Sequence, residues 1–185
     1  NEADFAMSKI AADERFGGNM LRKAIDYFCH LAVDPAFYGQ LSSKDHEFMA
    51  SEYADKLKWL KDDYENIYDP DYNDMLRVSF MHQFGRGKLG DLVSLLSGRD
   101  FIERTFKEEI AQDSFEKLTA GVINFMNKYT FEQFVLAIKS AGFINPKQLN
   151  SKMTLDFAYT LYLLLNSDKE FPKVEIKPCV QKWFI

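Results

Sequence analysis

Apolar residues recur every three or four positions along almost the whole chain. This spacing is typical of amphipathic helices and differs from the strict alternation of half-buried strands. The nine glycines and five prolines fall between the periodic segments, where they form turns or end helices. The pattern therefore predicts an all-α fold, a compact multi-helix domain of about seven to nine helices.

The expected helices are placed by their apolar stripes and by the residues that begin and end them. Those early in the chain lie at residues 5–12, 19–31 and 42–67, and the later ones at 72–84, 89–96, 115–129, 131–138 and 155–165. Thr130 with Gln133 forms the clearest capping box. The 155–165 helix is apolar on almost all sides, so we expect it at the centre of the domain. Pro172 and Pro178 are expected to break up the last segment.

The two ends of the sequence indicate a fragment. The chain begins at Asn1 without an initiator Met and ends on the apolar stretch 180–185. Natural termini are usually polar and loosely ordered. We therefore expect residues 1–185 to be a single helical domain cut from a larger protein.

Composition narrows the classes of protein that the chain can belong to. With 46% hydrophobic and 15% aromatic residues it has ample material for a core, which excludes a disordered chain. A net charge of −5 excludes a global basic field, so that any contact with nucleic acid has to come from a local patch.

Other features of the sequence indicate where in the cell the protein is expected. We expect no signal peptide, and the longest apolar run, residues 157–165, is far shorter than the roughly 20 residues that span a bilayer. Cys29 and Cys179 could form one disulfide, but two buried thiols in a reducing compartment fit two cysteines better. We expect a cytoplasmic protein that does not contact the membrane.

A glycine-rich stretch carries the main candidate for binding. Residues 85–90 satisfy the dinucleotide pattern G-x-G-x-x-G, but that pattern works after a parallel strand, and here a helical segment precedes it. An interhelical turn is therefore expected, with Arg86 and Lys88 beside the backbone N–H groups that open the next helix, a geometry that favours an anion. Further basic residues follow that helix, so the candidate phosphate-binding set is Arg86, Lys88, Arg99 and Arg104, with Lys107 beside them. The alternative is solvated charge or ion pairing with Glu103, Glu108 and Glu109.

No catalytic, metal or cofactor site is complete in the sequence. Residues 69–74 imitate the start of a calcium loop, but Asp74 and Phe80 stand where the loop needs Gly and a bidentate Glu. Helix capping by Asp71, with Asp74 in the first turn, explains these carboxylates better. The three histidines are not paired at metal-binding spacing, and there is no C-x-x-C. We therefore expect no catalytic residue, no metal and no cofactor.

Five stretches spread across nearly the whole chain, at residues 2–10, 17–28, 74–78, 86–101 and 140–143, have distinctive sequences. In these stretches the chain resembles the GmrSD-type restriction family, whose members have a ParB-like N-terminal domain with an Asp-Gly-Gln-Gln-Arg motif. The chain itself contains neither that motif nor a His-rich nuclease signature. The resemblance implies the helical region of a bacterial protein that acts against phage or foreign DNA, between a nucleotide-responsive domain and, often, an HNH-type nuclease.

Together these observations favour a non-catalytic helical module of a DNA-targeting defence protein. Its partners are then the flanking domains of the parent, with DNA phosphates as a candidate ligand of the four basic residues and a homo-oligomer left open. The alternative is a protein-interaction or oligomerisation module that never touches nucleic acid. The acidic total and the apolar end at Trp183 and Phe184 favour this alternative.

Overall fold

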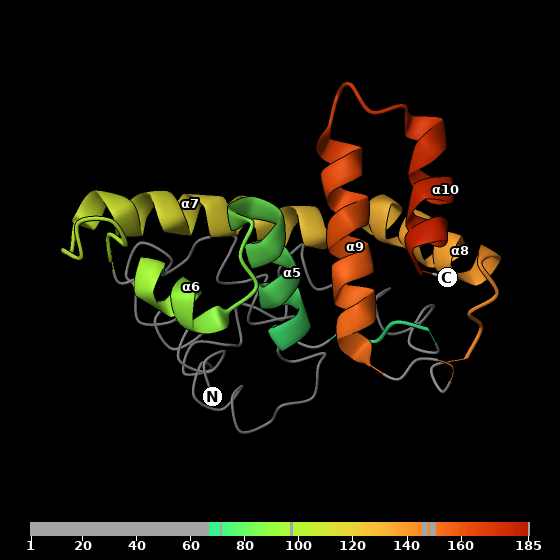
Figure 1. Ribbon diagram of the computed structural model, residues 1–185, viewed down its shortest axis with the longest axis horizontal. Helices are drawn as coiled ribbons and strands as arrows, with labels where there is room; N and C mark the ends of the chain where they lie inside the picture. Colours follow the sequence, from blue (N-terminus) through green and yellow to red (C-terminus); the bar gives the residue numbers. More distant parts are fainter. Residues whose placement is uncertain (1–66, 71, 97, 146–147, 149–150, 185) are drawn as a thin grey trace, which may run out of the picture.

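Helices account for most of the chain that the structure describes. The computed structural model describes residues 67–184 except 71, 97, 146–147 and 149–150 (Figure 1). Six helices follow one another there: α5 (Tyr72–Phe84), α6 (Leu89–Leu96), α7 (Glu108–Phe125), α8 (Lys128–Ser140), α9 (Lys152–Ser167) and α10 (Lys173–Phe184). The described part contains no strand, only one isolated antiparallel bridge. The all-α class is confirmed for it, whereas the helices expected before residue 67 lie outside the described residues, and the total of seven to nine stays a prediction.

The bounds of α5 and α6 agree with the expected helices at 72–84 and 89–96. Those of α7 and α8 differ, because the chain breaks between them earlier than expected, at Met126 and Asn127. Asn127 caps α8: its Oδ1 accepts the Thr130 backbone N–H at 3.0 Å and the Thr130 hydroxyl at 2.9 Å. The predicted capping box of Thr130 with Gln133 is therefore wrong, since Thr130 already lies inside the first turn of the helix.

The prediction that Pro178 breaks the last segment is also wrong. Pro172 does precede the helix, but Pro178 lies within α10. A proline inside a helix removes one backbone hydrogen bond. Here the helix continues because Ile176, Val180 and Phe184 form a buried stripe against the domain, and burying such side chains contributes about 1.5–3 kcal/mol each.

The helices are arranged around α5 and α7. The long α7 runs across the described part, and α9 and α10 stand side by side, with α10 over α8 (Figure 1). α5 packs against both α7 and α9, α6 covers the N-terminal half of α7, and α10 also packs on α8. None of the described helices has the length and apolar character to cross a bilayer.

An aromatic cluster fills the core where α7, α8 and α9 meet. The Tyr159 ring lies 4.8 Å from the Phe134 ring and 5.3 Å from the Phe125 ring, centroid to centroid. Tyr68, from the segment before α5, stacks on Phe131 at 5.6 Å. All five rings are buried. Such pairs stabilise by about 0.5–1.5 kcal/mol beyond the burial of their area, so the cluster fixes how α8 and α9 lie on the end of α7.

The α5–α7 contact depends on the absence of a side chain at Gly121. A Cβ built on this residue would lie 2.9 Å from the Ser79 carbonyl oxygen and 2.9 Å from Gln83 Cγ. The carbonyl belongs to the backbone of α5 and cannot move without shifting the helix. Gly121 therefore sets how closely the two helices approach.

We expect Gly121→Ala to destabilise the protein by about 1–3 kcal/mol, because the methyl group forces α5 and α7 apart. Chemical denaturation measures the change. The matched control is Ala120→Gly at the exposed neighbouring position, which should cost about 1 kcal/mol from helix propensity alone. Since propensity favours alanine at both positions, a Gly121→Ala variant about 1 kcal/mol more stable than the parent would contradict the close crossing.

Candidate functional site

The four candidate basic residues lie in the turn between α5 and α6 and in the loop between α6 and α7. The second of these, residues 98–107, is closed as a small hairpin by the bridge between Arg99 and Phe106. At its base the Lys107 N–H donates to the Gly98 carbonyl at 2.8 Å. Gly98 has φ +86°, and a Cβ there would lie 2.5 Å from the Lys107 carbonyl oxygen. Only glycine fits this approach, so Gly98 both ends α6 and closes the loop.

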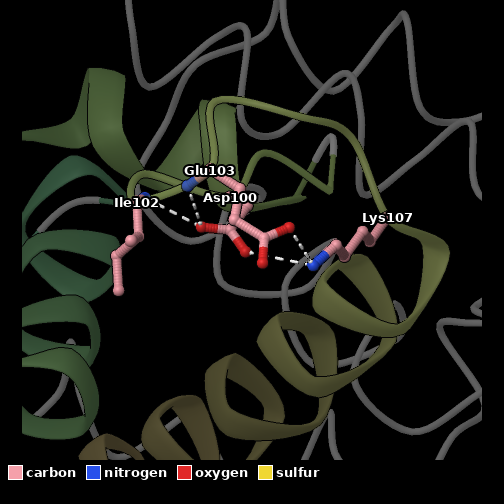
Figure 2. Close-up of polar contacts among 4 residues, drawn as sticks. All are labelled: Asp100, Ile102, Glu103 and Lys107. Atoms are coloured by element: carbon pink, nitrogen blue, oxygen red, sulfur yellow. Dashed lines mark hydrogen bonds and ion pairs between the residues drawn. The ribbon is translucent and has the colours of Figure 1, made fainter.

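The Asp100 carboxylate organises the tip of this loop. Its Oδ1 accepts the backbone N–H groups of Ile102 at 2.8 Å and of Glu103 at 3.0 Å, as Figure 2 shows. Its Oδ2 lies 3.5 Å from Lys107 Nζ, and Lys107 also pairs with Glu103. The two backbone hydrogen bonds, followed by the Lys107 charge, lower the pKa of Asp100. The carboxylate therefore keeps its charge and holds the turn in place.

Two of the candidate residues converge on one aromatic ring. The Arg86 guanidinium carbon lies 4.8 Å from the centroid of the Phe101 ring, and that of Arg99 lies 5.7 Å from it. Arg86 also pairs with Asp91 of α6, Nη1 to Oδ2, at 3.2 Å. Cation–π contacts at exposed sites contribute about 0.5–1 kcal/mol. Sequence reasoning did not single out Phe101, although an aromatic residue two positions after Arg99 and outside any helical stripe is a readable signal.

Lys88 and Arg104 are exposed, and neither forms an ion pair with a described residue. The structure does not bring them to Phe101. Lys107, the fifth candidate, is held by Asp100 and Glu103, so ion pairing of the kind considered as the alternative occurs for this residue. The first turn of α6 carries Asp91, which places a carboxylate where the sequence predicted an anion to bind.

Arg104 has a left-handed backbone. Its φ is +57°, and among the described residues other than glycine no second one is positive. This conformation costs an L-residue about 1–2 kcal/mol. The turn held by Asp100 therefore maintains Arg104 against its own backbone preference.

The other motifs find structural explanations. α5 directly precedes Gly85, so the strand that a dinucleotide site requires is replaced by a helix. Asp74 lies in the first turn of α5 as expected, while Asp71 is outside the described residues. Within the described ranges no three His, Cys, Asp or Glu residues are grouped to hold a metal. Cys179 is a free thiol that is only partly buried, contrary to the expectation of a buried one, and Cys29 lies outside the described part.

A buried polar cluster between α5 and α9 escaped sequence reasoning. Asp156 is fully buried in α9 and accepts a hydrogen bond from the Tyr68 hydroxyl at 2.9 Å. Arg77 Nε lies 3.9 Å from Asp156 Oδ2, and Lys152 Nζ lies 2.6 Å from Asp74 Oδ2. The readable signal is a single carboxylate inside the apolar stretch 155–165.

Apolar side chains are also exposed near the candidate basic residues. In the 98–107 loop the exposed fraction of Ile102 is 92% and that of Phe106 is 70%. On the far side of the fold Phe157 of α9 stacks on Trp183 of α10 at 4.8 Å, each half-exposed. The 98–107 loop thus combines apolar and guanidinium groups on one short segment.

Comparisons of the chain with protein-family models, with curated proteins and with solved structures each found no match.

We expect Arg104→Gly to stabilise the protein by about 0.5–1 kcal/mol. Glycine adopts the left-handed backbone without strain, and the larger backbone entropy that it loses on folding offsets only part of this stabilisation. Thermal and chemical unfolding measure it. Arg99→Gly is the matched control: it removes the same charge from a residue of the bridge whose φ is negative, and it should destabilise. Equal losses in both variants would rule out strain at Arg104.

Proposed function

We propose that the chain is a non-catalytic helical module of a bacterial DNA-targeting defence protein, and that its 85–107 segment binds DNA phosphates. The module would connect a nucleotide-responsive ParB-like domain with a nuclease domain, as the resemblance to the GmrSD-type family implies. The observation that carries the DNA contact is the convergence of Arg86 and Arg99 on Phe101. It supports the proposal because the ring positions two guanidinium groups whose remaining N–H donors can reach phosphate oxygens.

The local charge supports the same partner. Residues 85–107 hold five Lys and Arg against three Asp and Glu, a net charge of +2 in a chain of −5. The three acids are engaged by Arg86 and Lys107. Lys88, Arg99 and Arg104 have no carboxylate partner among the described residues, so their charges are available to an anionic surface.

Contacts of this kind position a protein on DNA without reading its sequence. Each lysine or arginine that neutralises a phosphate releases a counterion, so the logarithm of the binding constant falls linearly with the logarithm of the salt concentration. Binding through this segment should therefore depend steeply on salt and little on the DNA sequence.

The second candidate is a docking site for another protein, such as a neighbouring subunit or a second copy of the chain. The nearly full exposure of Ile102 and Phe106 favours it. Apolar side chains surrounded by arginines are typical of the centres of protein–protein interfaces. A protein partner would use these two residues, whereas phosphate contacts would not need them.

We expect Lys88→Gln with Arg104→Gln to weaken DNA binding by the full chain and to reduce the salt slope by about 2, one for each lost phosphate contact. Fluorescence anisotropy with a labelled duplex across a salt series measures both quantities. The matched control, Lys169→Gln with Lys182→Gln, removes two exposed charges from the α9–α10 end and should change neither. If both pairs behave alike, Lys88 and Arg104 do not contact phosphates, and the same measurement on Arg86→Gln with Arg99→Gln decides whether the segment binds DNA at all.

We expect Ile102→Ser with Phe106→Ser to leave the affinity for DNA and its salt slope unchanged. Concentration-dependent association, measured by analytical ultracentrifugation of the full chain, tests the second candidate. Association that these two substitutions abolish would favour the protein-docking function. A parent protein that stays monomeric at every concentration would speak against self-association.

A further inference from the structure

Asp156 is a charged residue in the interior of the fold. It lies one turn into α9, and its residue is fully buried. Carboxylates are almost never fully buried unless they are paired and hydrogen-bonded, because the loss of hydration is costly. The surroundings of this carboxyl group therefore decide in which protonation state it exists.

The partners of Asp156 satisfy only one of its two oxygens. Oδ1 accepts the Tyr68 hydroxyl at 2.9 Å. Among the described residues, buried Oδ2 has no donor within hydrogen-bond distance, and buried Arg77 Nε, 3.9 Å away, has no hydrogen-bond acceptor. An ion pair at this separation offers little against the desolvation of both groups. If Asp156 were ionised, these contacts would offset little of the free energy lost when its charge leaves water.

A second carboxyl group lies at the same contact. Asp74 and Arg77, on one face of α5, pair with Lys152 and Asp156, which lie one turn apart on α9. Asp74 of α5 is buried and is paired with Lys152, Nζ to Oδ2, at 2.6 Å. Lys152 thus compensates Asp74, while Asp156 has no equivalent partner. Two carboxylates in one poorly hydrated site repel each other, and such pairs keep one proton between them.

We propose that Asp74 and Asp156 share one proton at the contact between α5 and α9, and that release of this proton weakens that contact. With the proton in place, the pair is joined by a hydrogen bond between the two carboxyl groups. Without it, two like charges face each other and the second oxygen of Asp156 has no donor. The stability of the contact between α5 and α9 therefore depends on pH.

The electrostatics of the site agree with this geometry. Burial, followed by the Asp74 charge, raises the pKa of Asp156 to about 7, and a hydrogen bond with Asp74 raises it further, while the Tyr68 hydrogen bond and the Arg77 charge lower it. Burial also raises the pKa of Tyr68, so that its hydroxyl stays a donor.

Of the described helices that pack on α9, α8 and α10 place no charged group that acts on Asp156 at this end. α8 faces it with the Phe131 and Phe134 rings. Lys173, at the start of α10, donates to the carbonyls of Asn166 and Asp168 at the opposite end of α9. In the described part of the chain the groups acting on Asp156 are therefore Tyr68, Asp74 and Arg77, with Lys152 acting through Asp74.

The sign of the pH dependence follows. An unfolded aspartate titrates near pH 3.9, and the folded group titrates near 7, so the native state binds the extra proton between these values. Stability from this group is complete below about pH 4 and is lost as the pH rises to 7. His82 acts in the opposite direction, since burial lowers its pKa from 6.5 and its contribution therefore rises with pH. Its effect can be removed separately.

The experiment combines carboxyl ¹³C NMR with denaturant unfolding of the full chain between pH 5 and 8, in a His82→Gln background. We expect one carboxyl resonance with a midpoint near 7, and an unfolding equilibrium constant that rises by up to about tenfold per pH unit towards neutrality. Asp156→Asn should remove this rise, because the amide keeps an acceptor for Tyr68 and a donor for Asp74.

A second variant guards against a failure of Asp156→Asn to fold. Asp74→Asn removes the neighbouring charge and should move the midpoint of Asp156 to lower pH. The matched control is Asp113→Asn, which neutralises an exposed carboxylate of α7 paired with Lys117 and should leave the pH profile unchanged. The proposal is overturned if all carboxyl groups titrate below pH 5, or if Asp74→Asn leaves the midpoint where it was.

Discussion

The core of this protein is constrained by the hydroxyl groups of its buried tyrosines. The Tyr159 hydroxyl donates to the Phe125 carbonyl at the end of α7 at 2.8 Å, and the Tyr68 hydroxyl donates to Asp156. A buried hydroxyl without an acceptor costs about 1–3 kcal/mol. The buried tyrosines therefore require hydrogen-bond acceptors for their hydroxyl groups inside the core. One acceptor is a carbonyl at the end of a helix, and the other is a carboxyl group in the interior of α9.

The hydrophobic pattern predicted helices more reliably than their ends. It placed α5 and α6 correctly because a glycine follows each of them closely, at Gly85 and Gly98, and interrupts the periodicity. It misplaced the start of α8, since Asn127 and Thr130 are both good caps and only the geometry of the turn decides between them. At Pro178 the local preference against a helix was overridden by burial of the α10 stripe, which is a tertiary effect that a local pattern does not contain.

The candidate site was predictable in part. The basic residues of the 85–107 segment are visible in the sequence, but only part of their grouping is. Phe101 is close in the chain to Arg99, as Asp100 and Glu103 are to Lys107, whereas the contact of Arg86 with Phe101 depends on how the two turns fold together. Of the carboxyl pair, only Asp156 carries a signal of its own, as a lone carboxylate in an apolar stretch. Its pairing with Asp74 is not readable, because the two residues are separated by more than eighty positions.

Pro178 makes the first residues of α10 less stable than the rest of the helix. It has no N–H to donate to the carbonyl of Val174, whose exposed fraction is 81%. The opening residues, Lys173 to Glu175, are therefore tied to the rest of the helix by one hydrogen bond fewer, and all three are exposed. Such a turn can fray while the stripe from Ile176 to Phe184 stays docked, since local opening needs far less free energy than global unfolding. Amide hydrogen exchange along α10 would then follow the burial of its side chains rather than the length of the helix.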